Sequence, residues 1–177
     1  MKKILLALCT LFICNAAQAE FYVGAGYGLS INQGSVKELN KKTSYKDSNA
    51  LSVSGGVALP LPLLDIRGEV EYFRTRPETK DFGTKHLDAV MANATGVIPL
   101  IPFIDPYVGV GMGYARYDHN NTTAWQALAG VEYNFLTLPF IVGAEYRFLK
   151  LTEKGGKKDV SSKYYTHGVM LKLKYTF

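Results

Sequence analysis

Apolar and polar side chains alternate along most of this chain, and the pattern is clearest over residues 165–177. One parity of this segment is apolar or aromatic, and the other is mostly small, polar or basic: Val169, Leu171, Leu173, Tyr175 and Phe177 against Gly168, Met170, Lys172, Lys174 and Thr176. Because successive side chains of a β-strand point to opposite faces, this period of two predicts a strand with one apolar and one charged face.

Seven further segments show the same period of two: 20–29, 49–59, 64–74, 86–98, 107–117, 123–135 and 140–149. Each has the length of about ten residues or more that a tilted strand needs to cross a bilayer. Segment 86–98 is apolar at both parities, and only Asn93 and Thr95, opposed to Val90, favour one orientation. The chain therefore predicts eight strands.

The connections between these segments alternate in length, apart from a short link at 118–122. Short ones fall at 60–63, 99–106 and 136–139, and long polar ones at 30–48, 75–85 and 150–164. Outer-membrane barrels show this asymmetry, with short periplasmic turns and longer extracellular loops. The sequence thus predicts an all-β protein, an eight-stranded antiparallel up-and-down transmembrane β-barrel.

The amino-terminal residues predict export. Two lysines precede an apolar stretch at 4–14, and small residues that a signal peptidase accepts follow at 17–19. A membrane-anchoring helix is the alternative, but it needs about 20 apolar residues, and Asn15 interrupts this run. We expect a cleaved signal peptide at 1–19, a barrel domain at 20–177, and a location in the bacterial outer membrane.

Cysteine usage and net charge narrow the chemistry. Cys9 and Cys14 both lie in the predicted signal peptide, so the mature chain has no thiolate for catalysis or metal binding. Removing two of the 20 basic side chains with that peptide leaves 18 against 15 acidic ones, a net charge of +3. This excess is too small to favour nucleic-acid binding, and we expect no cofactor and no metal.

Glycine indicates which face points inward. A soluble secreted barrel would hold its apolar face inside and its charges in water. However, glycines in segments 20–29 and 107–117 share the parity of the charged residues, and on a solvated face they would only weaken the strands. Inside a narrow barrel they leave room for long side chains. The charged parity is therefore predicted to face the lumen.

The predicted lumen carries nine charged side chains of nearly balanced sign: Asp65, Glu69, Glu71, Glu132 and Glu145 against Arg67, Arg147, Lys172 and Lys174. Unpaired buried charge is costly, so we expect these groups to pair in an ionic network that plugs the lumen. Acid–base chemistry by Glu69 and Glu71 is the alternative, but two residues apart on one strand they merely share a face. We predict no catalytic residues.

Two motifs carry a family resemblance. The run Pro106-Tyr107-Val108-Gly109-Val110-Gly111-Met112-Gly113-Tyr114 and the ending Tyr175-Thr176-Phe177, with the signal peptide, resemble the OmpA-type and opacity-protein-like family of small outer-membrane barrels. The resemblance spans the mature chain and implies that the barrel-assembly machinery recognises the last strand at Leu171, Leu173, Tyr175 and Phe177. Because no residue follows Phe177, we expect no peptidoglycan-binding domain.

Basic residues in the long connections and at strand ends suggest surface contacts. The candidates are Lys41, Lys42, Lys157 and Lys158 in the loops, and Arg74 and Arg116 near strand ends. They could hold the phosphates of lipopolysaccharide, or an anionic polymer on a host surface. Solvated loop lysines are the alternative. We expect a structural or surface-interaction role, of the adhesin or antigen kind.

Two other functions stay open at this point. An outer-membrane enzyme, such as a lipid A hydrolase, needs a nucleophile, a base and an orienting acid. The histidines are His86, His119 and His167; His167 has no serine at a neighbouring outward position, and His86 lies with Asp88 at a loop edge. A small pore is the other alternative, and the nearly neutral lumen favours a plug instead.

Overall fold

The computed structural model describes residues 19–35, 42–44, 48–61, 63–76, 78–79, 83–84, 86–99, 102–117, 120–135, 137–152 and 163–177. Eight long strands run through these residues: β1 (Glu20–Ser35), β3 (Ser48–Leu59), β4 (Asp65–Thr75), β7 (Leu87–Val97), β8 (Ile104–Tyr117), β9 (Asn120–Asn134), β10 (Phe140–Thr152) and β11 (Lys163–Thr176). Three short strands accompany them: β2 (Lys42–Ser44), β5 (Glu78–Thr79) and β6 (Gly83–Thr84). Within the same residues, no helix has the length and apolarity that crossing a membrane requires.

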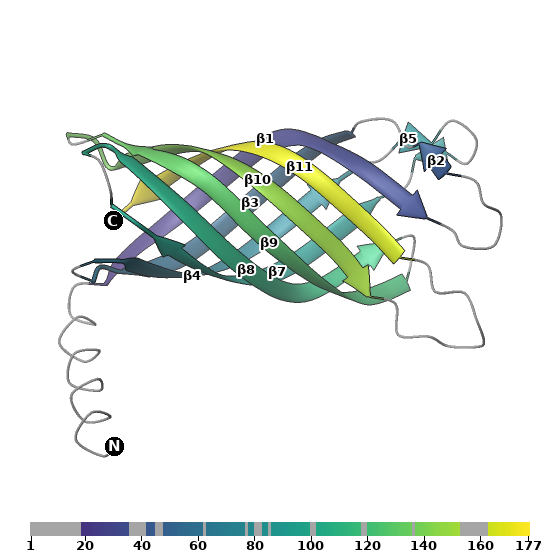
Figure 1. Cartoon of the computed structure of the whole chain (residues 1–177), viewed down its shortest axis with the longest axis horizontal. Coiled ribbons are helices and arrows are strands. Elements are labelled where there is room, and N and C mark those ends of the chain that lie inside the picture. The colour runs from purple at the N-terminus through teal and green to yellow at the C-terminus, as the bar shows by residue number, and fades with distance from the viewer. Residues whose placement is uncertain are drawn as a thin grey trace, which may run out of the picture.

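The eight long strands close into a barrel (Figure 1). Each pairs antiparallel with the next one along the chain, and β11 pairs back to β1 from Tyr22↔Thr176 to Ser35↔Lys163. The three short connections, β3 to β4, β7 to β8 and β9 to β10, lie at the same end as the start of β1 and the end of β11. Short turns of such barrels face the periplasm, so we call this the periplasmic end and the opposite one the extracellular end.

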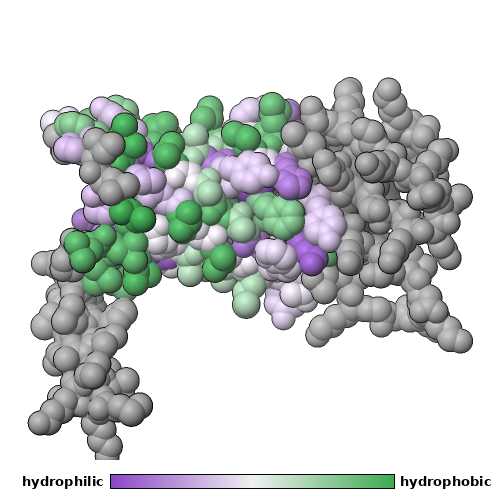
Figure 2. All heavy atoms as spheres, viewed as in Figure 1, coloured by the Kyte–Doolittle hydropathy of each residue, from purple (hydrophilic) through white to green (hydrophobic). Residues whose placement is uncertain are grey.

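The two parities of the strands separate as predicted. Apolar side chains are spread over the exterior among paler ones on the face that Figure 2 shows, and Leu171, for example, is 65% exposed. The charged parity points inward, where Glu71 is 0% exposed. In β7, Asn93 is buried and Val90 is exposed, which is the orientation that these residues favoured. The predicted eight-stranded transmembrane barrel is therefore confirmed.

Glycines make room for two interior tyrosines. A Cβ atom on Gly56 would lie 2.6 Å from the ring of Tyr22, and one on Gly130 would lie 2.6 Å from the ring of Tyr107. A backbone carbonyl lies equally close to each of these Cβ positions, 2.5 Å for Gly68 O at Gly56 and 2.6 Å for Ala144 O at Gly130, so no side chain fits at either glycine unless both the facing tyrosine and a neighbouring strand move. The glycines thus leave space for long side chains, as expected of a narrow barrel.

Several strands extend further toward the extracellular end than the hydrophobic pattern indicated. β1 continues to Ser35, β10 continues to Thr152 and β11 begins at Lys163, whereas the sequence assigned 30–48 and 150–164 to loops. These assignments were wrong at their edges, because a ladder needs only backbone donors and acceptors and continues where the side chains are no longer alternating. β8 likewise begins at Ile104, inside the predicted turn 99–106.

The interior consists of two layers rather than one charged plug. Buried charged side chains occupy its middle and periplasmic part. Toward the extracellular end, a cluster of buried apolar side chains fills the barrel: Ala50, Phe73, Leu87, Ala89, Met91, Ala115, Ala124, Leu149, Leu151 and Met170. We call this cluster the apolar layer. The sequence analysis missed it, and its expectation of a lumen that is charged throughout was incomplete.

Candidate functional site

Five charged side chains from three strands meet in the middle of the barrel. The Arg147 Nη2 atom lies 2.7 Å from Glu71 Oε1 and 2.7 Å from Glu145 Oε1. The Lys172 Nζ atom lies 3.0 Å from Glu145 Oε2, 3.4 Å from Glu71 Oε1 and 3.7 Å from Glu69 Oε1. We call Glu69, Glu71, Glu145, Arg147 and Lys172 the central cluster. Strands β4, β10 and β11 position these residues, because the inward-pointing side chains of the three strands meet at the same height in the barrel.

Two amides that the sequence analysis did not include in the network connect to the central cluster. The Nδ2 atom of Asn93 donates to Glu69 Oε1 at 3.1 Å and to Glu71 Oε2 at 3.2 Å. Gln126 Nε2 donates to Asn93 Oδ1 at 2.6 Å. Amides satisfy carboxylate oxygens without adding charge, so Asn93 and Gln126 supply further donors to the carboxylates of the cluster. Their inward parity in β7 and β9 was the signal that could have identified them.

A second group of charges lies nearer the periplasmic end. Glu132 forms a short ion pair with Arg67, and its Oε1 atom lies 2.6 Å from Lys174 Nζ. We call Arg67, Glu132 and Lys174 the periplasmic cluster. The Lys174 ammonium also lies 5.0 Å from the ring centre of Tyr22 and 5.5 Å from that of Tyr107, within cation–π range.

Tyrosine hydroxyls connect the two clusters. Tyr22 donates to Glu69 Oε2 at 3.3 Å, and Tyr107 donates to Glu145 Oε2 at 2.9 Å. Both rings pack beside Lys174 of the periplasmic cluster and place their hydroxyls on carboxylates of the central cluster. The sequence analysis did not assign either tyrosine a role, because strand 20–29 carries Tyr22 among glycines and Tyr107 begins the glycine-rich strand.

Eight of the nine predicted lumen charges belong to these two clusters. The exception is Asp65, which is half-buried at the periplasmic start of β4 and is absent from the ion pairs of the described residues. Asp105 lies buried near the same end and accepts a short hydrogen bond from Asn134. The sequence analysis placed Asp105 in a turn, so it was left out of the lumen inventory.

The paired charges are balanced, with four acidic side chains and four basic ones in the two clusters: Glu69, Glu71, Glu132 and Glu145 against Arg67, Arg147, Lys172 and Lys174. All eight are buried. Removing an ion from water costs several kcal/mol, and this is offset only when partners and hydrogen bonds surround the ion. This arrangement holds charge in place and presents no free nucleophile or open metal site among its members.

Arg147 joins the central cluster to the apolar layer. Its guanidinium lies 4.8 Å from the ring centre of Phe73, the large aromatic member of that layer. Two of its nitrogens, Nε and Nη1, have no hydrogen-bond partner. Face contact with an aromatic ring partly compensates an arginine for missing hydrogen-bond acceptors, because the guanidinium is planar and weakly hydrated.

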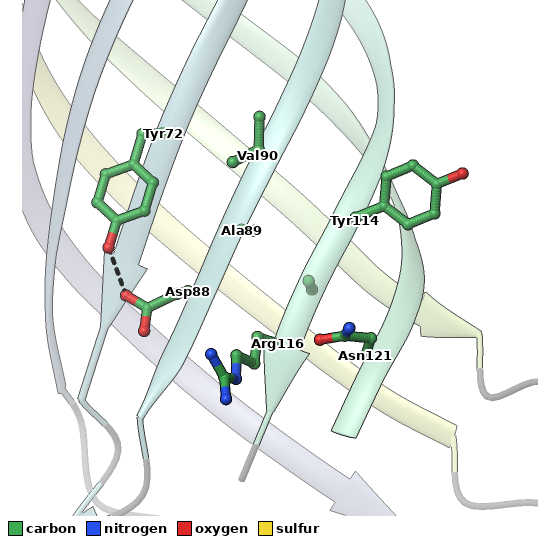
Figure 3. A pocket seen from close by; sticks show the side chains of 8 residues that line it. Tyr72, Asp88, Ala89, Val90, Tyr114, Arg116 and Asn121 are labelled. Carbon is green, nitrogen blue, oxygen red and sulfur yellow. Dashed lines mark hydrogen bonds between the residues drawn. The ribbon is translucent and has the colours of Figure 1, made fainter. Parts of the chain in front are cut away.

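A groove of about 240 Å³ opens on the exterior at the extracellular rim, and the predicted surface residue Arg116 is one of those that line it (Figure 3). The other predicted surface arginine, Arg74, lies beside the groove, next to its lining residue Asp88. Arg74, Asp88, Arg116 and Asn121 stand side by side across β4, β7, β8 and β9. Asp88 Oδ1 accepts hydrogen bonds from Tyr72 Oη at 2.6 Å and from Arg74 Nε at 2.7 Å. We call Arg74, Asp88, Arg116 and Asn121 the rim row.

Most of the predicted loop lysines fall outside the part of the chain that the structure describes. Lys41, Lys157 and Lys158 lie outside the described residues, and Lys42 is described only by its backbone in β2, opposite Ser35. Their proposed contacts therefore rest on the sequence.

The predicted assembly positions lie on the exterior of β11. Leu171, Leu173, Tyr175 and Phe177 all point away from the barrel. The Tyr175 ring packs edge-on against Phe140 and Phe177, and the Phe177 amide donates to the Phe21 carbonyl at 2.9 Å. These side chains form a continuous aromatic and aliphatic surface at the seam where the barrel closes.

The described histidines show no catalytic arrangement. His167 faces outward and its Nδ1 atom hydrogen-bonds the Tyr146 hydroxyl at 2.6 Å, with the Phe148 ring centre 5.0 Å away. His86 is exposed beside β7, and His119 lies outside the described residues. In the part of the chain that the structure describes, no group of three or more histidine, cysteine or carboxylate side chains could hold a metal ion.

A closed sheet with an apolar exterior and a filled, paired interior defines a membrane-spanning β-barrel, because only closure satisfies every backbone group in lipid. The family model described as "Outer membrane protein beta-barrel domain" matches residues 4–177, and the chain belongs to this family. The protein therefore lies in the bacterial outer membrane, as predicted. Among curated proteins, no sequence matches the chain.

Solved structures agree with this class. The chain is similar to Neisserial surface protein A (NspA), with 18% sequence identity, a TM-score of 0.65, and coverage of 90% of this chain and 99% of that one. It is also similar to the outer membrane enzyme PagL, at 14% identity and TM-score 0.58, over 82% and 97% of the two chains. The outer membrane protein OprG from Pseudomonas aeruginosa matches at 11% identity and TM-score 0.54, over 90% and 96%. At these identities, the similarity establishes the shared fold.

Proposed function

We propose that this protein is a closed, non-conducting outer-membrane barrel with a structural or surface-interaction role, and that basic residues of its extracellular loops make the contacts. The observation that carries the proposal is the filled interior. Eight paired charges and the apolar layer occupy the lumen of the described barrel, so the exterior and the loops are the surfaces left for a partner.

The apolar layer supports the absence of a continuous water path. Leu87, Met91 and Leu149 are completely buried at the extracellular side of the charges. An ion that crossed the barrel would have to break the paired clusters and then leave its hydration shell among apolar side chains, which costs many kcal/mol. Solute passage through this lumen would therefore require a large rearrangement.

The loop sequences support contact with anionic partners. Residues 36–47 carry four lysines against Glu38 and Asp47, and residues 153–162 carry three lysines against Glu153 and Asp159, so both loops are basic. Clustered lysines attract phosphates, sulfates and carboxylates and accelerate association at low ionic strength. Suitable partners are the lipopolysaccharide of the outer leaflet and anionic polymers of a host surface. NspA, which has a similar fold, is named a surface protein.

Loop-charge variants test this role. Bacteria that display the protein with K41Q, K42Q, K157Q and K158Q together are compared with bacteria that display the unchanged chain, on surfaces coated with a sulfated polysaccharide. We expect at least about tenfold fewer retained cells for the variant, because several charge contacts are lost at once. A variant with arginine at the same four positions is the matched control and should be retained normally. Equal retention of the glutamine variant would refute the loop role.

We also propose that the exterior of β11 is the surface that the barrel-assembly machinery recognises. Leu171, Leu173, Tyr175 and Phe177 present apolar and aromatic side chains on one face of the strand. Replacing Phe177 by serine should reduce the amount of folded barrel in the outer membrane, measured by heat-dependent gel mobility. Unchanged amounts would argue against recognition at this position.

We propose no catalytic role for the described histidines. The ring nitrogen of His167 that could orient an acid is bonded to Tyr146, and its outward neighbours are Phe148 and Tyr165 rather than a serine. The lipid A of cells with the unchanged protein and with H167N should therefore have the same mass spectrum. A lipid A species that is lost only in the variant would favour an enzyme.

A further inference from the structure

The extracellular rim of β4, β7, β8 and β9 carries two registered rows of outward side chains. The outer one is the rim row, and directly beneath it Tyr72, Val90 and Tyr114 stand side by side on β4, β7 and β8. A polar row above an apolar row is the arrangement that an amphiphilic molecule would match at the membrane surface, since its head and tail need different environments.

The rim row has an excess of positive charge. Arg74 and Arg116 flank a single carboxylate, Asp88, whose Oδ1 atom holds Arg74 through Nε. Arg116 is exposed and makes no ion pair with another residue in the described part of the chain. Asp88 thus orients one guanidinium, and the other is open to bind an anion. Arginine forms paired hydrogen bonds with phosphate oxygens, which makes phosphate the matching chemistry.

The apolar row forms a trough on the lipid-facing surface. Val90 lies between Tyr72 and Tyr114 and lines the groove together with them, and Tyr114 has 75% of its surface exposed (Figure 3). One step deeper in the membrane, Ala92 lies between Val70 and Met112. Small side chains on β7 are therefore flanked by larger ones on both neighbours.

The trough has the length of a buried hydrocarbon segment. From Asp88 to Ala92 the strand advances roughly 13 Å at its usual rise per residue, which is roughly 10 Å of membrane depth for a strand tilted as in such barrels. One leaflet of a bilayer core is about 15 Å thick. An acyl chain that starts at the rim row and follows β7 would therefore remain beside these side chains through more than half of the outer leaflet.

We propose that this groove is a binding site for one phosphorylated, acylated lipid of the outer leaflet, namely the lipid A part of lipopolysaccharide. Its phosphate binds Arg116 and Arg74, and one acyl chain lies over Val90 and Ala92 between the two tyrosines. The proposal rests on the proposed exterior role and names a partner for it, but it uses none of the loop lysines. Its success or failure is therefore separate from that of the loop contacts.

A matched control lies on the neighbouring face of the barrel. Lys150 lies near the extracellular end of β10, opposite Trp125, and its ammonium lies 5.4 Å from the ring centre of Trp125 and 5.7 Å from that of Tyr165. The bulky Phe148 follows it toward the membrane centre and packs against both of those rings. This position has a cation without a trough, so removing its charge should leave lipid A binding at the groove unchanged.

The test measures binding of purified full-length protein to bisphosphorylated lipid A in detergent micelles by native mass spectrometry. The double variant R74Q/R116Q should weaken binding about tenfold or more, because charged hydrogen bonds to phosphate are lost. K150Q should stay within about twofold of the unchanged protein. Each variant is first checked for the heat-dependent gel mobility of a folded barrel.

Four results would overturn the proposal. Equal affinity of R74Q/R116Q and the unchanged protein would remove the phosphate site, and equal binding of lipid A stripped of its phosphates would do the same. Equally tight binding of phosphatidylglycerol would contradict the choice of lipid A. A92L should weaken binding severalfold without touching the arginines, and an unchanged affinity would refute the trough. The four-lysine loop variant should bind as the unchanged protein does, which separates this site from the loop role.

Discussion

The two halves of the barrel interior solve the same packing problem with different chemistry. On the periplasmic side, the central and periplasmic clusters fill the lumen with charges that are stable only as a complete set. On the extracellular side, the apolar layer fills it with side chains that need no specific partner. The stability of the ionic half therefore depends on the presence of every charged partner, whereas the stability of the apolar half depends on how well its side chains fill the available volume.

The largest expected effect is the loss of Arg147, the buried centre of the ionic half. Replacing Arg147 by alanine leaves Glu71 and Glu145 with Lys172 as the remaining cation of the cluster, and should lower the free energy of unfolding by about 3–5 kcal/mol. Urea unfolding of the barrel in lipid vesicles measures it. The triple variant R147M/E71Q/E145Q also removes the carboxylates that R147A leaves without their partner, so it should recover part of the loss. An R147A barrel as stable as the unchanged one would contradict a packed ionic cluster.

Next in size is a cavity in the apolar half. Leu149 is fully buried, so Leu149→Ala should lower the free energy of unfolding by about 2–4 kcal/mol through lost contacts and the space left behind. Leu149→Met keeps the volume and should cost less than about 1.5 kcal/mol in the same unfolding experiment. If both substitutions cost the same, the interior here is not close-packed.

The eight strands and their faces could be predicted because charge and glycine mark one parity over most of the barrel. The apolar layer could not, since Leu149, Leu151 and Met170 share the parity of Arg147 and Lys172 but carry no polar mark. At the extracellular end both parities are apolar, and a period of two is then no longer visible.

The hydrogen-bond partners of the lumen charges could be identified only from the pairing of the strands in the structure. Asn93 reaches Glu69 and Glu71 because β4 and β7 place Glu69 opposite Asn93, and no sequence pattern encodes this pairing. Tyr107 reaches Glu145 across the interior, from a strand that is not paired with β10. The types of the site residues were thus predictable, but the partners of each were not.

A smaller effect is expected from filling the space that glycine leaves for an interior tyrosine. Gly130→Ala should lower the free energy of unfolding by about 1–3 kcal/mol, because the new methyl group would overlap the Tyr107 ring. Gly68→Ala is the matched control, since a Cβ there meets nothing within 4 Å. The difference between the two midpoints of urea unfolding measures the tightness of the interior, and equal midpoints would show that the Tyr107 ring and the Ala144 backbone both yield without cost.

The smallest effect is expected from an ion pair outside the barrel. Arg74 and Asp88 are 41% and 28% exposed, so Asp88→Asn should change the free energy of unfolding by about 0.2–1 kcal/mol. The same measurement at high salt should reduce this difference further. A loss as large as that of R147A would mean that the rim pair is as important to stability as the buried clusters.

The most direct test of the filled interior is the electrical conductance of the purified barrel in a planar lipid bilayer. The paired clusters and the apolar layer predict no steady current, only rare and brief openings, over a wide range of voltage and salt. A stable open channel with current proportional to voltage would contradict the closed lumen on which the proposed exterior role depends.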